Sequence, residues 1–398
     1  MGVEAMRIAF VDSVLEPAKP GRSGMSDTVW GMAGQLTTLG HEAHMIGSYR
    51  TEAFPDHRIA VHHFPAPPMA YRNVLGLAWR MRRTAHVIRS LRPDIVHARD
   101  YLAAALLDIF LPGVPLVLTT PGNIFHRIAH GGNPYEWYYT QLLKWGARRT
   151  ARRAQAIVAI SRSMRDWWLW TGSHPDRTHH IPLGADLARF TYVPDARATV
   201  GIAEGVTHFL FAGRFSPEKG VATLLDAVHI SRAAFTDAGA TVTLVGSGSQ
   251  EAILKAKVDE LQLDRFVRFV PWVEQDQLPA WYSAADAFVL PSFTEGFSRT
   301  VIEAMATGTP VIGSRITGTE DHVIPGQNGF LFEAGDAKAL ARHLTACVEA
   351  PSVVRSMRAS AADYARRHLS WDVVVKRLVD EVYVPVLSRR NGTRWNRA

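Results

Sequence analysis

The chain has 398 residues, of which 47% are hydrophobic and 20% charged, an ordinary globular composition whose length suggests about two domains. Its single cysteine excludes an intrachain disulfide, and no apolar run approaches the length of a transmembrane helix. Asp12 and Glu16 interrupt the first apolar stretch, which argues against a signal peptide, so we expect a cytoplasmic protein.

The net charge of +7 is unevenly distributed. Residues 1–185 hold 21 lysines and arginines against 13 acidic residues, whereas residues 186–398 hold 23 against 24. The basic first half is compatible with binding to nucleic acid, but an anionic substrate or an anionic membrane surface fits better with the motifs of the second half.

In the first half, short apolar segments alternate with amphipathic ones. Strands are expected at residues 7–13, 42–48, 94–98, 115–120, 154–161 and 178–184, and helices at residues 27–40 and 73–92. This alternation is typical of a parallel sheet that is covered by helices on both faces.

The second half repeats the rhythm, with strands expected at residues 208–213, 241–248, 267–272, 287–292 and 309–314. The sequence therefore predicts an α/β protein with two doubly wound, Rossmann-like domains, which would bind substrates in a central cleft that both domains face. We expect domains at residues 1–188 and 189–370, a helix at 371–387 that packs back on the first domain, and a disordered tail at 388–398.

Two glutamates, Glu295 and Glu303, flank an expected helix start in the stretch PSFTEGFSRTVIEAMATGTPVIGS. Ser298 can cap this helix, whose first turn presents unpaired N–H groups suited to phosphate. Carboxylates beside it could accept hydrogen bonds from sugar hydroxyls, although solvated surface charges are the commoner role of such residues.

Two cations lie upstream in FAGRFSPEKG, where Arg214 follows a strand beside Gly213 and Lys219 precedes a helix. Such a pair can clamp a diphosphate, the arginine by its planar fork and the lysine as a point charge. The turn VGSG around Gly246 follows the next strand.

This ordered series resembles the retaining glycosyltransferases of family 4, which have the GT-B fold. Members of that family carry, in this order, the motifs G-R, K-G, V-G-x-G and E-G-F, with seven residues between two glutamates. This chain has each of these motifs in the same order, at residues 213–220, 245–248 and 295–303. The resemblance covers roughly residues 6–385. It implies hexose transfer from a nucleotide diphosphate sugar, such as a UDP- or GDP-sugar, to an acceptor hydroxyl, with no cofactor and no metal required.

The resemblance also implies roles for individual residues. Arg214 and Lys219 would hold the diphosphate, and Glu295 would bind the donor sugar together with the backbone of Gly296, Phe297 and Ser298. Glu303 would bind the ribose. Gly246 and Trp272 would frame the base, although a tryptophan there is as often core.

The first half departs from the family pattern. Where members often have a glycine pair after the first strand, this chain has Gly21 and Gly24. Where many have a histidine, Pro121 stands, which leaves His97, His126 and His130 as candidate acceptor-side bases, and the departing phosphate as another. The alternative to an enzyme is a catalytically silent GT-B subunit that binds a nucleotide sugar and scaffolds a partner.

Residues 138–155 form an expected helix with a cationic stripe. Between positions 144 and 165 there are seven basic residues and no acidic one, namely Lys144, Arg148, Arg149, Arg152, Arg153, Arg162 and Arg165. Trp167, Trp168 and Trp170 follow. The stripe is either a solvated face beside a tryptophan core, or a peripheral contact with an anionic membrane that presents a lipid-linked or otherwise anionic acceptor.

Overall fold

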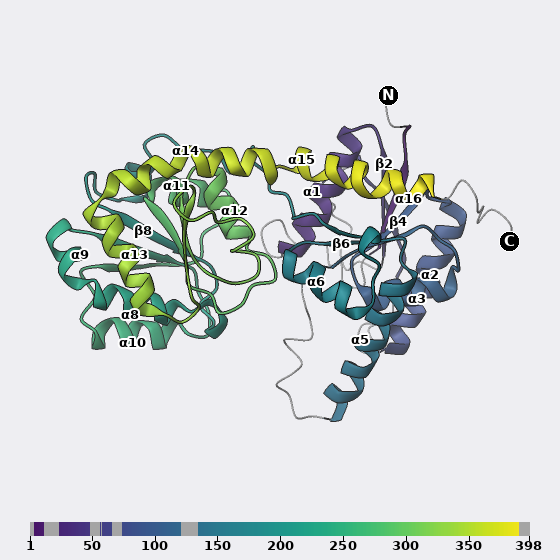
Figure 1. Cartoon of the computed structure of the whole chain (residues 1–398), viewed down its shortest axis with the longest axis horizontal. Coiled ribbons are helices and arrows are strands. Elements are labelled where there is room, and N and C mark those ends of the chain that lie inside the picture. The colour runs from purple at the N-terminus through teal and green to yellow at the C-terminus, as the bar shows by residue number, and fades with distance from the viewer. Residues whose placement is uncertain are drawn as a thin grey trace. The chain divides into compact units, whose positions relative to one another are not determined.

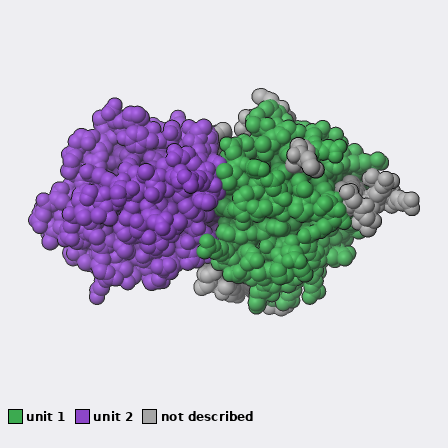
Figure 2. Space-filling model, turned by 45° about the horizontal axis from the view of Figure 1, so that its top comes forward, with its two compact units in different colours: residues 1–184, 371–398 green, residues 185–370 purple. Residues whose placement is uncertain are grey.

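The computed structural model describes residues 4–11, 24–47, 56, 58–65, 74–120 and 134–389. Residues 1–184 and 371–398 form one compact unit, and residues 185–370 form the other (Figures 1 and 2). Gly21, Pro121, His126 and His130 lie outside the described residues, as does most of the tail, from residue 390 onward.

The first unit contains a seven-stranded parallel sheet of order β3-β2-β1-β4-β5-β6-β7. Its strands are β1 (Arg7–Val11), β2 (Glu42–Gly47), β3 (Ala60–His63), β4 (Ile95–Ala98), β5 (Leu116–Thr120), β6 (Ala156–Ala159) and β7 (Thr178–His180).

Helices cover both faces of this sheet (Figure 1). They are α1 (Gly24–Thr38), α2 (Val74–Leu91), α3 (Tyr101–Phe110), α5 (Pro134–Arg153), α6 (Arg162–Thr171), α15 (Trp371–Leu378) and α16 (Val384–Ser388), with a short 3-10 turn (Pro175–Arg177). A π-helical turn (Val379–Tyr383) joins α15 to α16.

Alternation along β1 explains the two layers. Ile8 and Phe10 pack in one cluster with α1 and the C-terminal helical segment, while Ala9 and Val11 pack in another with α2 and α3. Successive side chains of a strand point to opposite faces, so a strand buried on both faces reads as a continuous apolar run. The C-terminal segment is thus an integral layer of the first unit.

The second unit contains a six-stranded parallel sheet of order β10-β9-β8-β11-β12-β13. Its strands are β8 (His208–Ala212), β9 (Thr241–Val245), β10 (Val267–Val270), β11 (Ala287–Leu290), β12 (Val311–Ser314) and β13 (Gly329–Phe332). Its helices are α7 (Ala196–Val200), α8 (Val221–Ile230), α9 (Arg232–Ala238), α10 (Glu251–Glu260), α11 (Leu278–Ala284), α12 (Arg299–Ala306), α13 (Ala337–Glu349) and α14 (Pro351–His368), with a 3-10 turn (Pro217–Lys219).

The predicted parallel, doubly wound sheets are confirmed, with differences in detail. The sequence did not predict strand β3, because its polar sequence, Ala-Val-His-His, lacks an apolar run. It also did not predict β13, whose two central residues are only partly buried. The strand expected at residues 178–184 ends at His180, shortly before Pro182, which has no N–H to donate to a ladder.

Strand order reverses once in each sheet, between β1 and β4 in the first and between β8 and β11 in the second. In open parallel sheets, ligands bind beyond the carboxyl ends of the strands at this switch point. The loops that follow β8 and β11 therefore mark the candidate site of the second unit, and the carboxyl ends of β1 and β4 mark that of the first.

Candidate functional site

An ion pair joins the two loops at the switch point of the second sheet. Lys219 Nζ, after β8, lies 2.6 Å from Glu295 Oε1, after β11. Ser292 Oγ donates to the same carboxylate oxygen at 2.8 Å. The lysine side chain is 23% exposed and the glutamate 11%, so the pair is largely shielded from water. The structure thus brings together two residues that are 76 positions apart in the chain.

Two glycines allow these loops to approach so closely. A Cβ on Gly220, whose φ is +62°, would lie 2.1 Å from the carbonyl oxygen of Pro291. A Cβ on Gly246 would lie 1.9 Å from the carbonyl oxygen of Gly213. Both distances are far inside van der Waals contact, so the loops after β8, β9 and β11 can meet only where side chains are missing.

Glu303 lies in the second turn of α12 and is 5% exposed. Tyr282 donates to Glu303 Oε2 at 3.1 Å, and Arg299 lies 3.6 Å from its other oxygen. Burial and the Glu303 carboxylate raise the pKa of Tyr282 well above its usual value, so its hydroxyl stays protonated as a donor. Neither glutamate is therefore a solvated surface charge.

The backbone between the two glutamates presents donors. Among the described residues, the backbone N–H groups of Gly296, Phe297 and Ser298 donate no backbone hydrogen bond. Ser298 does precede α12 as expected, but its hydroxyl contacts Thr319 Oγ1 at 3.4 Å and does not cap the helix. The cap prediction was wrong because a side chain from a later loop competes for that hydroxyl.

Arg214 and Trp272 are exposed at the same edge of the second sheet. Arg214 directly follows the turn after β8, and its guanidinium has no ion pair with the described residues. Trp272 lies two residues beyond β10 and is 57% exposed, so it is not a core tryptophan. Both side chains are accessible to a ligand at this edge.

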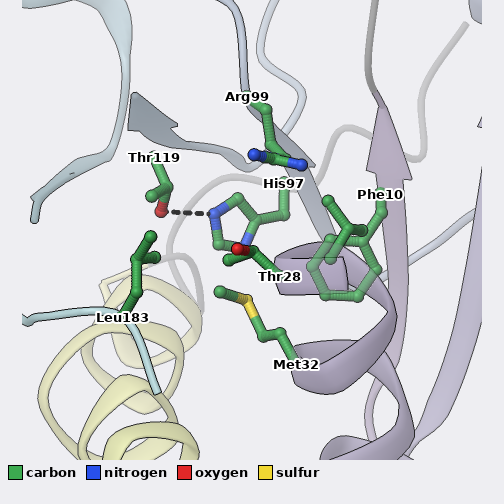
Figure 3. A pocket seen from close by; sticks show the side chains of 8 residues that line it. Phe10, Thr28, Met32, His97, Arg99, Thr119 and Leu183 are labelled. Atoms are coloured by element: carbon green, nitrogen blue, oxygen red, sulfur yellow. Dashed lines mark hydrogen bonds between the residues drawn. The ribbon is translucent and has the colours of Figure 1, made fainter. Parts of the chain in front are cut away.

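The first unit has a small pocket at the carboxyl ends of β4 and β5 (Figure 3). Its polar lining consists of Thr28 from α1, His97 from β4, Arg99 just beyond β4, and Thr119 from β5. The apolar lining is Phe10, Val29, Met32 and Leu183. Of the residues expected in this half, Gly24 is the first residue of α1.

His97 is fully buried in the wall of this pocket, and both its ring nitrogens have partners. Nε2 lies 2.7 Å from Thr119 Oγ1, and Nδ1 lies 2.6 Å from the hydroxyl of Tyr383 (Figure 3 shows the first contact). Burial, helped by the nearby Arg99, lowers the pKa of His97 to about 3. These contacts favour a positioning role for His97 over that of a general base.

Helix α5 carries the predicted cationic stripe, but two of its arginines are engaged within the unit. Arg149 lies 2.5 Å and Arg153 3.5 Å from a carboxylate oxygen of Asp108 in α3. The remaining members, Lys144, Arg148 and Arg152, are exposed.

The three tryptophans of α6 differ in environment. Trp168 is core and donates to Thr120 Oγ1, Trp167 packs on its edge, and Trp170 is 83% exposed. No described helix combines the length and the apolar character needed to cross a membrane.

Sequence reasoning missed the groups that orient these side chains. Ser292, Tyr282, Thr119 and Tyr383 are ordinary residues in ordinary positions, and only the fold brings them to the two sites. Among the motif-bearing residues of the second unit, Lys219 and Glu295 meet directly, and the roles predicted for the others stay predictions.

Family comparisons match almost the whole chain. Residues 193–368 match the family described as "Glycosyl transferases group 1", and residues 22–189 match "Glycosyltransferase Family 4". A D-inositol 3-phosphate glycosyltransferase of Streptomyces avermitilis is 32% identical over 369 residues, which cover 86% of this chain and 75% of the relative. A glycogen synthase of Mycobacterium tuberculosis is 30% identical over 298 residues, covering 72% and 67%.

Solved structures share the fold. The HepE protein of Anabaena, in complex with UDP, superposes with a TM-score of 0.76 at 21% identity and covers 94% of this chain and 99% of its own. A sucrose-phosphate synthase from Thermosynechococcus elongatus gives a TM-score of 0.76 at 22% identity, covering 97% and 98%. The two Rossmann-like units are those of the GT-B fold.

The matches in both halves agree with the ordered motifs of the second unit and with the paired sheets. They favour an enzyme that uses a nucleotide sugar over a catalytically silent subunit. The chain belongs to the family 4 glycosyltransferases of GT-B fold.

Proposed function

We propose that this glycosyltransferase moves a hexose from a UDP- or GDP-sugar to a hydroxyl of an anionic acceptor, with retention of the anomeric configuration. The observation that carries the proposal is the Lys219–Glu295 pair, held at 2.6 Å at the switch point of the second sheet. The second unit would hold the donor and the first unit the acceptor.

Lys219 and Arg214 would bind the diphosphate. Arg214 is exposed and forms no ion pair among the described residues, and its charge interacts with that of nearby Glu218. Lys219 balances Glu295 in the absence of donor, and an arriving diphosphate would share its charge. Both cations stabilise the leaving phosphate more strongly as its charge develops, which is how electrostatic preorganisation accelerates a reaction.

The two glutamates would divide the donor between them. Glu295, with the N–H groups of Gly296, Phe297 and Ser298, would bind the hexose. Glu303 would accept hydrogen bonds from the ribose hydroxyls, and Tyr282 orients its carboxylate. Trp272 and Gly246 would lie beside the base. UDP is the nucleotide in the complex of the Anabaena protein, which supports a UDP-sugar ahead of the alternative.

Retention is consistent with the residues near the acceptor pocket. His97 has a pKa of about 3, and both its ring nitrogens are hydrogen-bonded, so it is poorly suited to remove a hydroxyl proton at neutral pH. A departing phosphate on the same face of the sugar would take the proton instead. The two cations at the diphosphate would do the work that a metal does in other transferases, so we expect no metal requirement.

The acceptor is proposed to be anionic on two grounds. Several relatives are D-inositol 3-phosphate glycosyltransferases, and the substrate in that name carries a phosphate. The first half of the chain carries the whole excess of positive charge, and Lys144, Arg148 and Arg152 present an exposed cationic face with Trp170 exposed on the neighbouring helix. This face would attract an anionic membrane or steer a soluble anionic acceptor.

A donor screen tests the proposal directly. UDP-glucose and its GDP and ADP counterparts are incubated with the protein, and release of nucleotide is followed with and without D-inositol 3-phosphate. A ligand at ~100 times its dissociation constant should stabilise the protein by about 2.7 kcal/mol, so thermal unfolding identifies the donor independently of turnover. If no nucleotide sugar stabilises the protein or is hydrolysed, the assigned donor site is wrong.

A further inference from the structure

Three side chains form a buried hydrogen-bond chain that ends at the pocket of the first unit. Tyr383 contacts His97 Nδ1 at 2.6 Å, and His97 Nε2 contacts Thr119 Oγ1 at 2.7 Å. Tyr383 and His97 are each 0% exposed, and Thr119 is 3% exposed. Tyr383 lies 286 positions after His97 in the sequence, so this connection depends entirely on the fold.

The direction of these hydrogen bonds follows from what each group can do. Among the described residues, the hydroxyl of Tyr383 has His97 Nδ1 as its one hydrogen-bond partner, and burial raises its pKa, so it keeps its proton. The Tyr383 hydroxyl lies outside the pocket lining and would leave its O–H orphaned, at a cost of about 1–3 kcal/mol, if it did not donate to His97, whereas the Thr119 hydroxyl lines the pocket and can donate there. His97 Nδ1 is then an acceptor, and in the neutral ring Nε2 must carry the hydrogen.

The consequence falls on Thr119. Because Nε2–H donates to Oγ1, the hydroxyl hydrogen of Thr119 is not used by His97 and is left for another acceptor. Thr119 lines the pocket, beside Arg99 and Thr28 (Figure 3). The pocket thus offers a guanidinium and a hydroxyl donor, which is the chemistry that binds an oxygen of a phosphate group.

A π-helical turn aims Tyr383 at His97. The turn spans Val379–Tyr383, and its hydrogen-bonded loops (i→i+5) contain one more residue than those of the α-helices on either side. Such turns are rare and frequently lie at functional sites. Without the extra residue, the side chain at position 383 would be rotated by about 100° around the helix axis and would miss His97.

We infer that Tyr383 is a positioning residue, which orients His97 so that Thr119, together with Arg99, donates to a phosphate oxygen of the acceptor. The inference rests on the proposed function, in that the acceptor is taken to bind in the first unit. It adds the chemical class of the group that enters this pocket, and it makes the C-terminal segment part of acceptor recognition. The pocket has room for about one water-sized group, which fits a single phosphate oxygen and not a whole sugar ring.

Phosphate binding tests the inference without a known acceptor. Calorimetry with inorganic phosphate is done on the protein saturated with UDP, so that the diphosphate site is filled. Thr119→Val and Tyr383→Phe should each weaken phosphate binding by about tenfold to a hundredfold, the effect of one hydrogen bond to a charged group. Thr119→Ser, which keeps the hydroxyl, should bind as the wild type does.

Matched controls separate recognition from folding. Thr150→Val removes a buried threonine hydroxyl elsewhere in the same unit, where it donates to the carbonyl of Tyr101 at 2.8 Å, and should leave phosphate binding unchanged. The double variant Tyr383→Phe with Thr119→Val should be no weaker than Thr119→Val alone, because both changes remove the same donor. If Tyr383→Phe does not fold, Thr119→Val and Thr119→Ser still decide whether Thr119 donates to phosphate, and His97→Gln, which removes the ring between Tyr383 and Thr119, tests the connection.

Two further arms locate the phosphate. Soluble D-inositol 3-phosphate is compared with vesicles of phosphatidic acid in phosphatidylcholine, and the source that loses affinity on Thr119→Val is the one the pocket recognises. Equal phosphate affinity in wild type and Thr119→Val, or no binding to the wild type, overturns the inference. Failure of the proposed function is read separately, as loss of UDP binding in the same titrations.

Discussion

Replacing Lys219 by alanine should impair both the reaction and the stability of the second unit. The Lys219–Glu295 pair has an N–O distance of 2.6 Å and side chains that are 23% and 11% exposed, so it lies between a surface pair worth at most ~1 kcal/mol and a buried pair whose disruption costs ~3–5 kcal/mol. We therefore expect the Lys219→Ala change to lower the free energy of unfolding by roughly 2 kcal/mol. For a unit of this size, that lowers the melting temperature by about 4–8 °C.

The same change should slow the reaction by a separate effect. A charge-assisted contact to the diphosphate contributes ~1.5–3 kcal/mol, and if it acts fully in the transition state the rate falls roughly 10- to 150-fold. The assay is release of nucleotide from the sugar donor at a temperature well below the melting point of the variant. Arg214→Ala should show the same slowing with little loss of stability, because Arg214 is exposed and has no ion pair among the described residues.

The contrast between the two variants is the decisive control. If Lys219→Ala is slow only because it unfolds, Arg214→Ala will turn over normally. A folded double variant with the rate of the wild type would refute the assignment of both cations to the diphosphate.

The remaining predictions concern other parts of the two units. Glu303→Ala should weaken nucleotide affinity through loss of the ribose contact, and unchanged affinity in calorimetry would make Glu303 structural only. Product NMR should show retention of configuration, and turnover should survive EDTA; an inverted product would contradict the proposed mechanism. The protein should sediment with anionic but not neutral liposomes at low salt, and changing Lys144, Arg148 and Arg152 to glutamate should abolish this binding. Arg149→Glu should instead destabilise the first unit, because it removes the ion pair with Asp108. Absence of liposome binding by the wild type would point to a soluble acceptor. The pKa of His97 is about 3 in the folded chain and near its ordinary 6.5 when unfolded, so below pH 6.5 the unfolded state binds the extra proton. The free energy of unfolding should therefore fall by up to ~1.4 kcal/mol for each pH unit below 6.5. A melting temperature independent of pH between 6.5 and 4 would show that His97 is solvated.

By itself, the sequence determined the fold class and the family, and it predicted a set of donor-side residues whose roles stay predictions. Parallel strands buried on both faces leave a strong local signal, as at residues 208–212 and 287–290, where every position is buried. The glycines, Arg214, Lys219 and the two glutamates also lie in short motifs with fixed spacing. The meeting of Lys219 with Glu295 follows from topology, because the carboxyl ends of parallel strands share one edge of a sheet.

Only the tertiary structure decided the contacts that join distant segments. The pairing of Lys219 with Glu295, of Tyr282 with Glu303 and of Tyr383 with His97 leaves no local pattern, since each partner obeys the ordinary propensities of its own helix or loop. The cationic stripe of α5 shows the same limit. Its spacing is visible in the sequence, but the engagement of Arg149 and Arg153 by Asp108 depends on how α3 packs against α5. Helical periodicity shows which residues share one face of an element. Which residue each of them contacts in the core depends on how a second element packs against that face, and this element can lie hundreds of residues later in the chain.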